Sequence, residues 1–180
     1  PAEMDEFLQL AIPLSRRTYQ ARLLDAGLPD DKDARAGMRE LAADDQVRAY
    51  ILFLDQRPIA YLYLPVAGHT LVYAHLGYEP DYAELSPGTV LQMAALERLF
   101  AEDQFQFFDF TEGDGAHKKL FRTGSVTEFD LITDADHLAG MIDSFPAQLA
   151  DVDHAIDATE IDEHAEVFQT SNHPLHGLAD

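Results

Sequence analysis

Three carboxylates lie at or just after the end of a short apolar run in the second half of the chain. The run Gln106–Phe110 is typical of a buried strand, and Asp109, Glu112 and Asp114 stand at or beyond its C-terminal end. Sheets of the α/β class commonly bind their ligands at this end of a strand. A carboxylate buried there has a raised pKa, which suits a general base. The three acids are therefore candidates for proton transfer, and capping of a turn is the alternative role for each.

A basic cluster follows these acids. Lys118, Lys119 and Arg122 are three of only twelve cations in the chain, and they fall within five residues of one another. Beside a glycine-containing turn, such a cluster suggests a bound anion. Cations that stabilise the C-terminus of a helix are the alternative.

A second candidate anion site lies at the start of a helix. The segment Tyr82–Thr89 leads into a helical pattern that begins at Pro87, with Ser86 as the expected N-cap. The start of a helix exposes unpaired backbone N–H groups and the positive end of the helix dipole, which together suit a phosphate group. An ordinary capped helix is the alternative.

The elements that must position these residues predict a mixed α/β sheet. Helices are expected over Leu14–Ala26 with Ser15 as N-cap, over a segment that ends near Ala43, and over Pro87–Glu102 and Ala116–Arg122. Strands are expected over Val47–Leu54, Pro58–Pro65, Thr70–Leu76, Gln106–Phe110 and Val126–Ile132. The first three strands follow one another through short turns, which predicts an antiparallel meander. The later alternation of strand and helix completes a mixed, mainly antiparallel sheet flanked by helices. We expect the apolar strand at 106–110 to be central in this sheet.

Charge divides the chain unevenly. The net charge is -21, and the 58 residues after Arg122 carry thirteen Asp and Glu but no Lys or Arg. We expect a domain over residues 1–133, an acidic helical extension over 134–169 and a flexible tail over 170–180. Within the extension, Ala155–Phe168 is a candidate helix. An acidic surface is the simplest reading of the charge, and attraction of a cationic substrate is the alternative.

Composition also excludes several classes of function. Twelve cations against thirty-three acids disfavour nucleic acid as a partner. Without cysteine the chain has no disulfide, thiolate zinc site or cysteine nucleophile, which fits a cytoplasmic protein. No apolar run is long enough to span a bilayer, and the acidic start is unlike a signal peptide. His164, His173 and His176 lack the regular spacing of metal ligands, so no metal is expected.

Several segments together resemble a known family. They are Leu14–Tyr19, Arg57–Ala60, Leu85–Leu91, and the strand, turn and helix that run from Phe108 through Gly113, Lys118 and Phe121. Their order and spacing resemble the GNAT-fold acetyltransferases of the cellulose-biosynthesis (CelD/BcsL-like) type, with a likeness that extends from about Leu14 to Leu131.

This resemblance implies an acyl-CoA donor, acetyl-CoA in the first place. Splayed strands hold the pantetheine in the GNAT fold, and the loop into the following helix binds the pyrophosphate. The resemblance places that loop at Leu85, Ser86, Pro87, Gly88 and Thr89. It assigns Lys118, Phe121 and Arg122 to the same cofactor site.

The implied activity is transfer of an acetyl or other acyl group to an amine or hydroxyl of a small molecule or sugar. Such a transfer needs a base for the acceptor and an acid for the leaving thiolate. Phe121 stands where many family members place a tyrosine acid, which leaves His117 as the candidate acid. Tyr78 and Tyr82 are candidates for the acceptor site, with a place in the core as the alternative.

Two other functions stay open at this point. A Fem-like aminoacyl transferase shares the fold, although the acidic composition disfavours tRNA. A GNAT-like assembly module without catalysis is favoured by Phe121 and by the short Ser86-Pro87-Gly88 loop, which replaces the usual glycine-rich Gln/Arg-x-x-Gly-x-Gly/Ala sequence. The sequence leaves open whether the protein forms oligomers.

Overall fold

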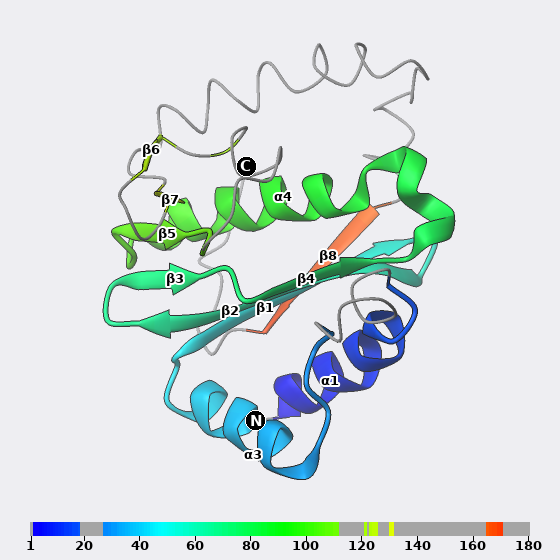
Figure 1. Cartoon of the computed structure of the whole chain (residues 1–180), viewed down its shortest axis with the longest axis horizontal. Coiled ribbons are helices and arrows are strands. Elements are labelled where there is room, and N and C mark those ends of the chain that lie inside the picture. The colour runs from blue at the N-terminus through cyan, green and yellow to red at the C-terminus, as the bar shows by residue number, and fades with distance from the viewer. Residues whose placement is uncertain are drawn as a thin grey trace, which may run out of the picture.

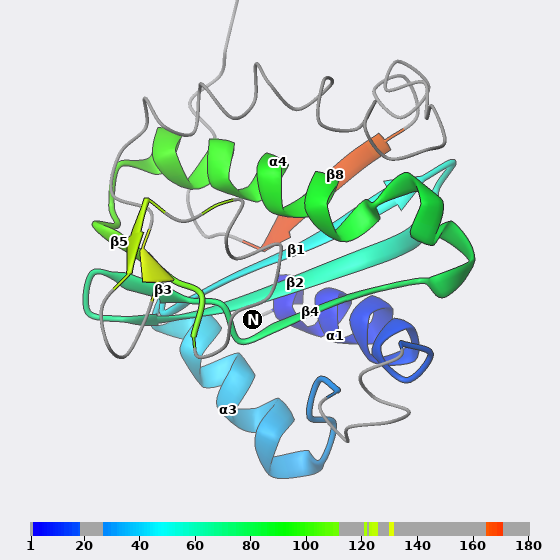
Figure 2. The same cartoon turned by 45° about the horizontal axis from the view of Figure 1, so that its top comes forward.

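The computed structural model describes residues 2–18, 27–111, 121, 123–125, 130–131 and 165–170. In these residues a mixed sheet lies between two helical layers (Figure 1). Helix α4 (Pro87–Glu102) covers one face, and α1 (Ala2–Ser15) and α3 (Lys32–Ala43) cover the other, as the turned view also shows (Figure 2). The mixed α/β architecture with flanking helices is therefore confirmed.

The strands of the main sheet are β1 (Val47–Leu54), β2 (Arg57–Ala67), β3 (Thr70–Val72), β4 (His75–Tyr78), β5 (Phe107–Asp109) and β8 (Ala165–Thr170). They lie in the order β5-β3-β2-β1-β8, and β4 pairs with β2 beside β3. A separate pair is formed by β6 (Gly124–Ser125) and β7 (Asp130–Leu131).

The predicted antiparallel meander is confirmed. β1 and β2 form a hairpin in which Leu54 pairs with Arg57. The two residues between them, Asp55 and Gln56, both have positive φ, at 49° and 64°. A turn of this hand matches the right-handed twist of the flanking strands. The expected third strand is divided into β3 and β4, and both pieces pair antiparallel with β2.

The expected central position of the strand at 106–110 is wrong. β5 pairs in parallel with β3 and forms an edge of the sheet in the described part of the chain. Phe108 and Phe110 are buried under α4, whereas Phe107 on the opposite face is 38% exposed. An apolar run predicts burial, but it does not distinguish an edge strand with one covered face from a central strand.

One further expectation is corrected. Residues 165–168 were expected within a helix over Ala155–Phe168, but β8 occupies Ala165–Thr170 and pairs antiparallel with β1. Of the strand expected over Val126–Ile132, the described residues show β7 at Asp130–Leu131, which pairs with β6. The domain boundaries at 133 and 169 stay predictions, although β8 belongs to the same sheet as β1.

The helix expected from Leu14 with Ser15 as its N-cap is also wrong at its start, because α1 ends at Ser15. The Ser15 hydroxyl instead accepts hydrogen bonds from the backbone N–H of Leu28 at 2.8 Å and from the Tyr61 hydroxyl at 3.0 Å. Ser15 therefore joins the end of α1 to the strand layer. The helix that ends at Ala43 is confirmed as α3, and Asp31 caps its start through the N–H groups of Asp33 and Ala34.

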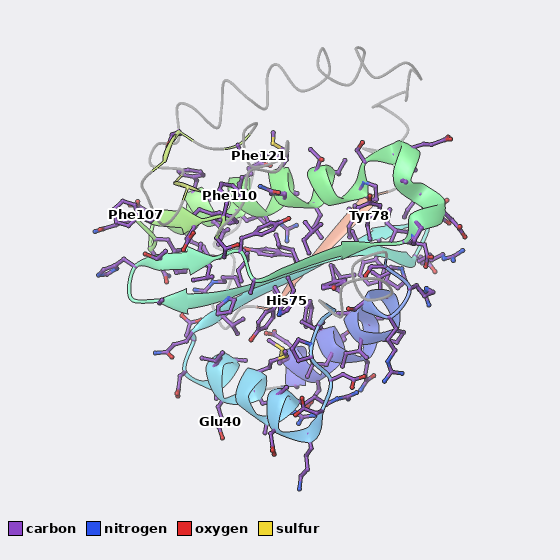
Figure 3. The ribbon with its side chains drawn as sticks, viewed as in Figure 1. Glu40, His75, Tyr78, Phe107, Phe110 and Phe121 are labelled. Atoms are coloured by element: carbon purple, nitrogen blue, oxygen red, sulfur yellow. The ribbon has the colours of Figure 1, made fainter. Side chains whose placement is uncertain are left out.

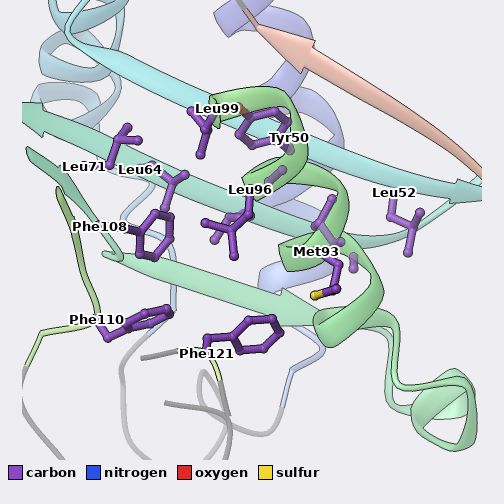
Figure 4. Packing of buried hydrophobic residues seen from close by; sticks show 14 of the residues in the cluster. Tyr50, Leu52, Leu64, Leu71, Met93, Leu96, Leu99, Phe108, Phe110 and Phe121 are labelled. Carbon is purple, nitrogen blue, oxygen red and sulfur yellow. The ribbon is translucent and has the colours of Figure 1, made fainter. Parts of the chain in front are cut away.

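Two apolar clusters hold the layers together. The larger lies between α4 and the sheet and includes Leu64, Leu96 and the two aromatic residues Phe108 and Phe110 (Figure 4). The smaller lies between α1, α3 and the opposite face. Because each face of the sheet has its own core, β4 is fixed from both sides where it leads into α4.

Candidate functional site

The candidate site lies where β4 ends and α4 begins. After Tyr78, the last residue of β4, Glu79 donates its backbone N–H to the carbonyl oxygen of Ile59 at 2.8 Å. A 3₁₀ helix, η1 (Pro80–Leu85), then connects β4 to α4. Both η1 and α4 begin with proline, whose fixed φ suits the first helical position and whose missing N–H is not needed there.

The first turn of α4 has the predicted start but not the predicted cap. Ser86 has left-handed backbone angles, φ 49° and ψ 46°, and its side chain makes no capping hydrogen bond. Its carbonyl oxygen accepts from the N–H groups of Thr89 at 2.9 Å and Val90 at 3.1 Å. Pro87 has no N–H, so among the described residues Gly88 carries the one first-turn amide without an acceptor. The left-handed conformation is one that glycine adopts more easily than serine.

Close packing joins this turn to β4. A Cβ atom on Gly88 would lie 3.0 Å from Cδ2 of Leu76 and 3.3 Å from Cδ1 of Tyr78. Tyr78 is 39% exposed, and its side chain lies beside the start of α4 (Figure 3). Tyr82 is half-buried on η1, and its ring lies under the guanidinium of Arg57, 5.5 Å from ring centroid to Cζ. Both predicted acceptor-site tyrosines are therefore near the start of α4.

The strand β5 ends before β4 begins along this edge of the sheet, and the two do not pair in the described residues. Val72 pairs with Asp109, and the N–H of Tyr73 donates to the carbonyl oxygen of Asp109 at 2.8 Å. Beyond this point, β4 pairs with β2 on one side and has no second strand partner among the described residues. The outer edge of β4 is therefore unpaired in the described part of the sheet between the end of β5 and the start of α4.

Asp109 is the last residue of β5 and lies at the end of this unpaired edge that is farthest from the start of α4. Its Oδ1 atom accepts a hydrogen bond from the N–H of Thr111 at 2.7 Å, in a turn where Thr111 has φ 61°. Tyr78 is six residues beyond Val72, the partner of Asp109, which corresponds to about 20 Å of strand. The structure therefore does not bring Asp109 next to the α4 start, and the carboxylate has the turn-capping contact given as its alternative role.

An aromatic cluster occupies the place of the expected tyrosine acid. Phe121 is fully buried, and its ring lies 6.4 Å from that of Phe110 between centroids (Figures 3 and 4). Tyr73 packs against Phe110 at 5.7 Å, and burial raises the pKa of the Tyr73 hydroxyl, which keeps it protonated. The other predicted residues of this region, Glu112, Asp114, His117, Lys118 and Arg122, lie outside the described residues, as do His164, His173 and His176.

Sequence reasoning missed Glu79. Its side chain is only 6% exposed, and its Oε2 atom accepts from Nε of Arg17 at 2.7 Å, with Nη2 of Arg57 4.0 Å away. A buried carboxylate requires a compensating charge, which these arginines provide. An acid directly after a strand was available as a signal, since the same signal led to Asp109.

None of the described helices is both long and apolar enough to cross a membrane.

Comparisons with known proteins identify the family. No curated protein matches the chain. Among solved structures, the PaiA N-acetyltransferase from Thermoplasma acidophilum in complex with coenzyme A matches at 13% sequence identity and a TM-score of 0.43, over 70% of this chain and 91% of that one. The family described as the acetyltransferase (GNAT) domain, Acetyltransf_6, matches residues 1–119, which is about two thirds of the 180 residues. The chain belongs to the GNAT acetyltransferase family.

Proposed function

We propose that this protein transfers an acetyl or other acyl group from coenzyme A to an amine or hydroxyl of a small molecule or sugar. The observation that carries the proposal is the edge of β4 that has no strand partner among the described residues and that leads to the start of α4. We propose further that it is of the CelD/BcsL-like type, on the strength of the segment order from Leu14 to Leu131.

The residues at the start of α4 fit the pyrophosphate of coenzyme A. The Gly88 amide has no acceptor among the described residues, and it lies at the positive end of a 16-residue helix. One turn further along α4, Nε2 of Gln92 is buried and has no hydrogen-bond partner in the part of the chain that the structure describes. An unsatisfied buried amide is unfavourable, so a polar ligand group within its reach would stabilise it. We therefore propose that Leu85–Thr89 holds the pyrophosphate, and that Lys118 and Arg122 add positive charge.

The unpaired edge of β4 supports a place for the pantetheine arm. The backbone of β4 faces away from β2 without a strand partner among the described residues. Backbone N–H and C=O groups on such an edge can bind an extended amide-containing chain as a strand would. Bound acyl-CoA would supply the thioester, and the chain's own residues would bind and orient the acceptor and move its proton.

We propose residues for two proton transfers, one from the acceptor and one to the leaving thiolate. An amine acceptor must be neutral to attack, and the proposed bases are Asp109, Glu112 and Asp114. Phe121 has no proton to donate and is packed in the aromatic cluster. We therefore propose His117 as the acid that protonates the leaving thiolate.

Calorimetry with acetyl-CoA tests the proposal. We expect saturable binding, and no binding at millimolar ligand would contradict the proposed function. His117→Ala should reduce turnover without reducing acetyl-CoA affinity. His69→Ala is a matched control, because His69 is exposed in the turn between β2 and β3, far along the sheet from α4's start. Binding of acetyl-CoA without turnover on any acceptor would favour an assembly module instead.

A further inference from the structure

Two guanidinium groups converge on one buried carboxylate at the exit of β4. Nε of Arg17 donates to Oε2 of Glu79 at 2.7 Å, and Nη2 of Arg57 lies 4.0 Å from the same oxygen. The Glu79 side chain is 6% exposed, but those of Arg17 and Arg57 are 45% and 56% exposed. The arginines are thus held by a buried anchor while their outer faces remain open to solvent.

The charges at this point do not balance. Among the described residues, one carboxylate faces two guanidinium groups, which leaves one positive charge in a protein whose net charge is -21. Each guanidinium carries five N–H donors, and Arg17 uses only its Nε toward Glu79. The acids of η1, Asp81 and Glu84, form no ion pair with either arginine among the described residues. A single arginine would suffice to pair Glu79, so the second is available for another anion.

The position of this pair relates it to the proposed acyl-transfer site. Arg57 lies over the ring of Tyr82, and Glu79 directly follows Tyr78, whose ring contacts the first turn of α4. Arg17 follows α1, which covers the face of the sheet opposite to α4 (Figure 2). Arg17 therefore approaches the end of β4 from the α1 side, while Arg57 connects it to η1 and the start of α4.

We propose that Arg17 and Arg57 form an anion subsite for the acyl acceptor, so that the acceptor class is an amine that also carries a carboxylate or phosphate. This inference rests on the proposed function and names its substrate class. Guanidinium groups bind carboxylates and phosphates through paired N–H donors, and Glu79 holds both arginines before the ligand arrives. The ring of Tyr82 packs against the guanidinium of Arg57 and so helps to hold that side chain in place. An acceptor held at its anionic group would present its amine toward the α4 side of β4.

Pairs of acceptors that differ only in a carboxylate test this proposal. The full chain is supplied with saturating acetyl-CoA and either L-lysine or cadaverine, L-arginine or agmatine, and L-serine or ethanolamine, and thiol release is followed. The same compounds are titrated calorimetrically into the protein saturated with coenzyme A, so that bound but unreacted acceptors are measured too. For at least one pair, we expect the carboxylate-bearing member to be preferred by about tenfold or more in kcat/KM or affinity.

Variants then assign the preference to the two arginines. Arg57→Gln and Arg17→Gln should each reduce the preference to near one while the affinity for acetyl-CoA stays unchanged, and Arg57→Lys should restore part of it. Arg16→Gln is the matched control, because the Arg16 side chain is 70% exposed and pairs with Asp30 rather than with Glu79. Urea denaturation of each variant confirms that the fold is kept.

The outcomes separate this inference from the function on which it rests. A wild-type preference near one in both measurements, or a preference that Arg57→Gln leaves intact, overturns the anion subsite. If Arg57→Gln weakens acetyl-CoA but not acetyl-3′-dephospho-CoA, the arginine binds the donor's phosphate, which also overturns it. Failure of the wild type to bind acetyl-CoA contradicts the proposed function itself.

Discussion

The Cδ1 atom of Tyr78 lies 3.3 Å from the point that a Cβ atom would occupy on Gly88, so the last residue of β4 contacts the first turn of α4. Cδ2 of Leu76, which lies on the same face of β4, is 3.0 Å from that point. Because these contacts leave little room for a side chain at position 88, the close approach of α4 to β4 excludes a branched residue there. The proposed pyrophosphate loop depends on this approach.

The first prediction concerns Gly88→Val. The branched side chain must displace Leu76 and Tyr78 or push the first turn of α4 outward, which we expect to destabilise the fold by about 1–3 kcal/mol. The Gly88 amide would move with the turn, and we expect the affinity for acetyl-CoA to fall at least about tenfold, or roughly 1.4 kcal/mol. Calorimetry measures the affinity. Gly88→Ala is the control, since the ends of two flexible side chains can yield by a few tenths of an ångström; equal affinity in Gly88→Val and wild type would contradict the proposed loop.

The second prediction concerns a tighter contact on the opposite face. A Cβ atom on Gly77 would lie 2.5 Å from Cε1 of Tyr61 and 2.7 Å from Cγ2 of Thr18. Since Tyr61 is buried and bonded to Ser15, its ring cannot yield easily. We expect Gly77→Ala to lower the free energy of unfolding by about 1–3 kcal/mol in urea denaturation.

Gly37 provides the matched control for this substitution. It lies within α3, and a Cβ atom there would meet nothing within 4 Å. Gly37→Ala should raise the free energy of unfolding by up to about 1 kcal/mol, because alanine is the better helix former. If the two alanine variants changed stability by the same amount and in the same direction, crowding at Gly77 would not be the cause.

The sequence predicted correctly those helices and strands whose ends are determined by neighbouring residues. β1 and α4 begin and end where the pattern placed them, since the change in periodicity at Val47 and the proline at position 87 act on their immediate neighbours. Partners that are distant in sequence were not predicted. Ser15 binds Leu28 and Tyr61, and β5 lies at an edge because its one described strand partner is β3.

The same is true of the candidate site: residues marked by adjacent sequence features were predicted, and those that depend on distant residues were not. Tyr78, Tyr82 and Ser86–Thr89 were found from a strand, a turn and a helix start that are adjacent in sequence. Glu79 was missed because its place in the site depends on an ion pair with Arg17, which is 62 residues away in sequence. It depends also on burial of the carboxylate, which the packing of α1 and β4 creates. The capping role of Ser86 was wrong because backbone angles, rather than residue type, decide whether its hydroxyl reaches an amide.

The third prediction concerns pH. His75 on β4 lies on the α1 face, with its ring 6.2 Å from that of Tyr63, and burial lowers its pKa below the ordinary 6.5. The unfolded chain therefore binds a proton more readily than the folded one, so stability falls as pH drops below 6.5. We expect His75→Gln to make the free energy of unfolding less dependent on pH in this acidic range. Urea denaturation between pH 5 and 7.5, with NMR titration of the His75 ring, measures both effects; a ring that titrates at or above 6.5 would rule out this cause.

The last prediction compares a buried ion pair with an exposed one. The Arg48 side chain is fully buried, and it bonds Glu102 and Asp45 at 2.9 Å each while its guanidinium lies 5.1 Å from the Phe105 ring centroid. It therefore joins the start of β1 to the end of α4. Arg48→Met removes the guanidinium partner of Glu102, whose side chain is only 15% exposed, and we expect a loss of about 3 kcal/mol in the free energy of unfolding.

Arg39 and Asp5 form the matched exposed pair, with side chains that are 43% and 45% exposed at 2.6 Å. Because water and salt screen such a pair, Arg39→Met should cost less than about 1 kcal/mol. Urea denaturation of both methionine variants at low and high salt measures the difference, and salt should reduce the effect of Arg39→Met more than that of Arg48→Met. If the two losses were equal, burial of Arg48 would contribute nothing beyond an ordinary surface contact, and the joint between β1 and α4 would have to depend on apolar packing alone.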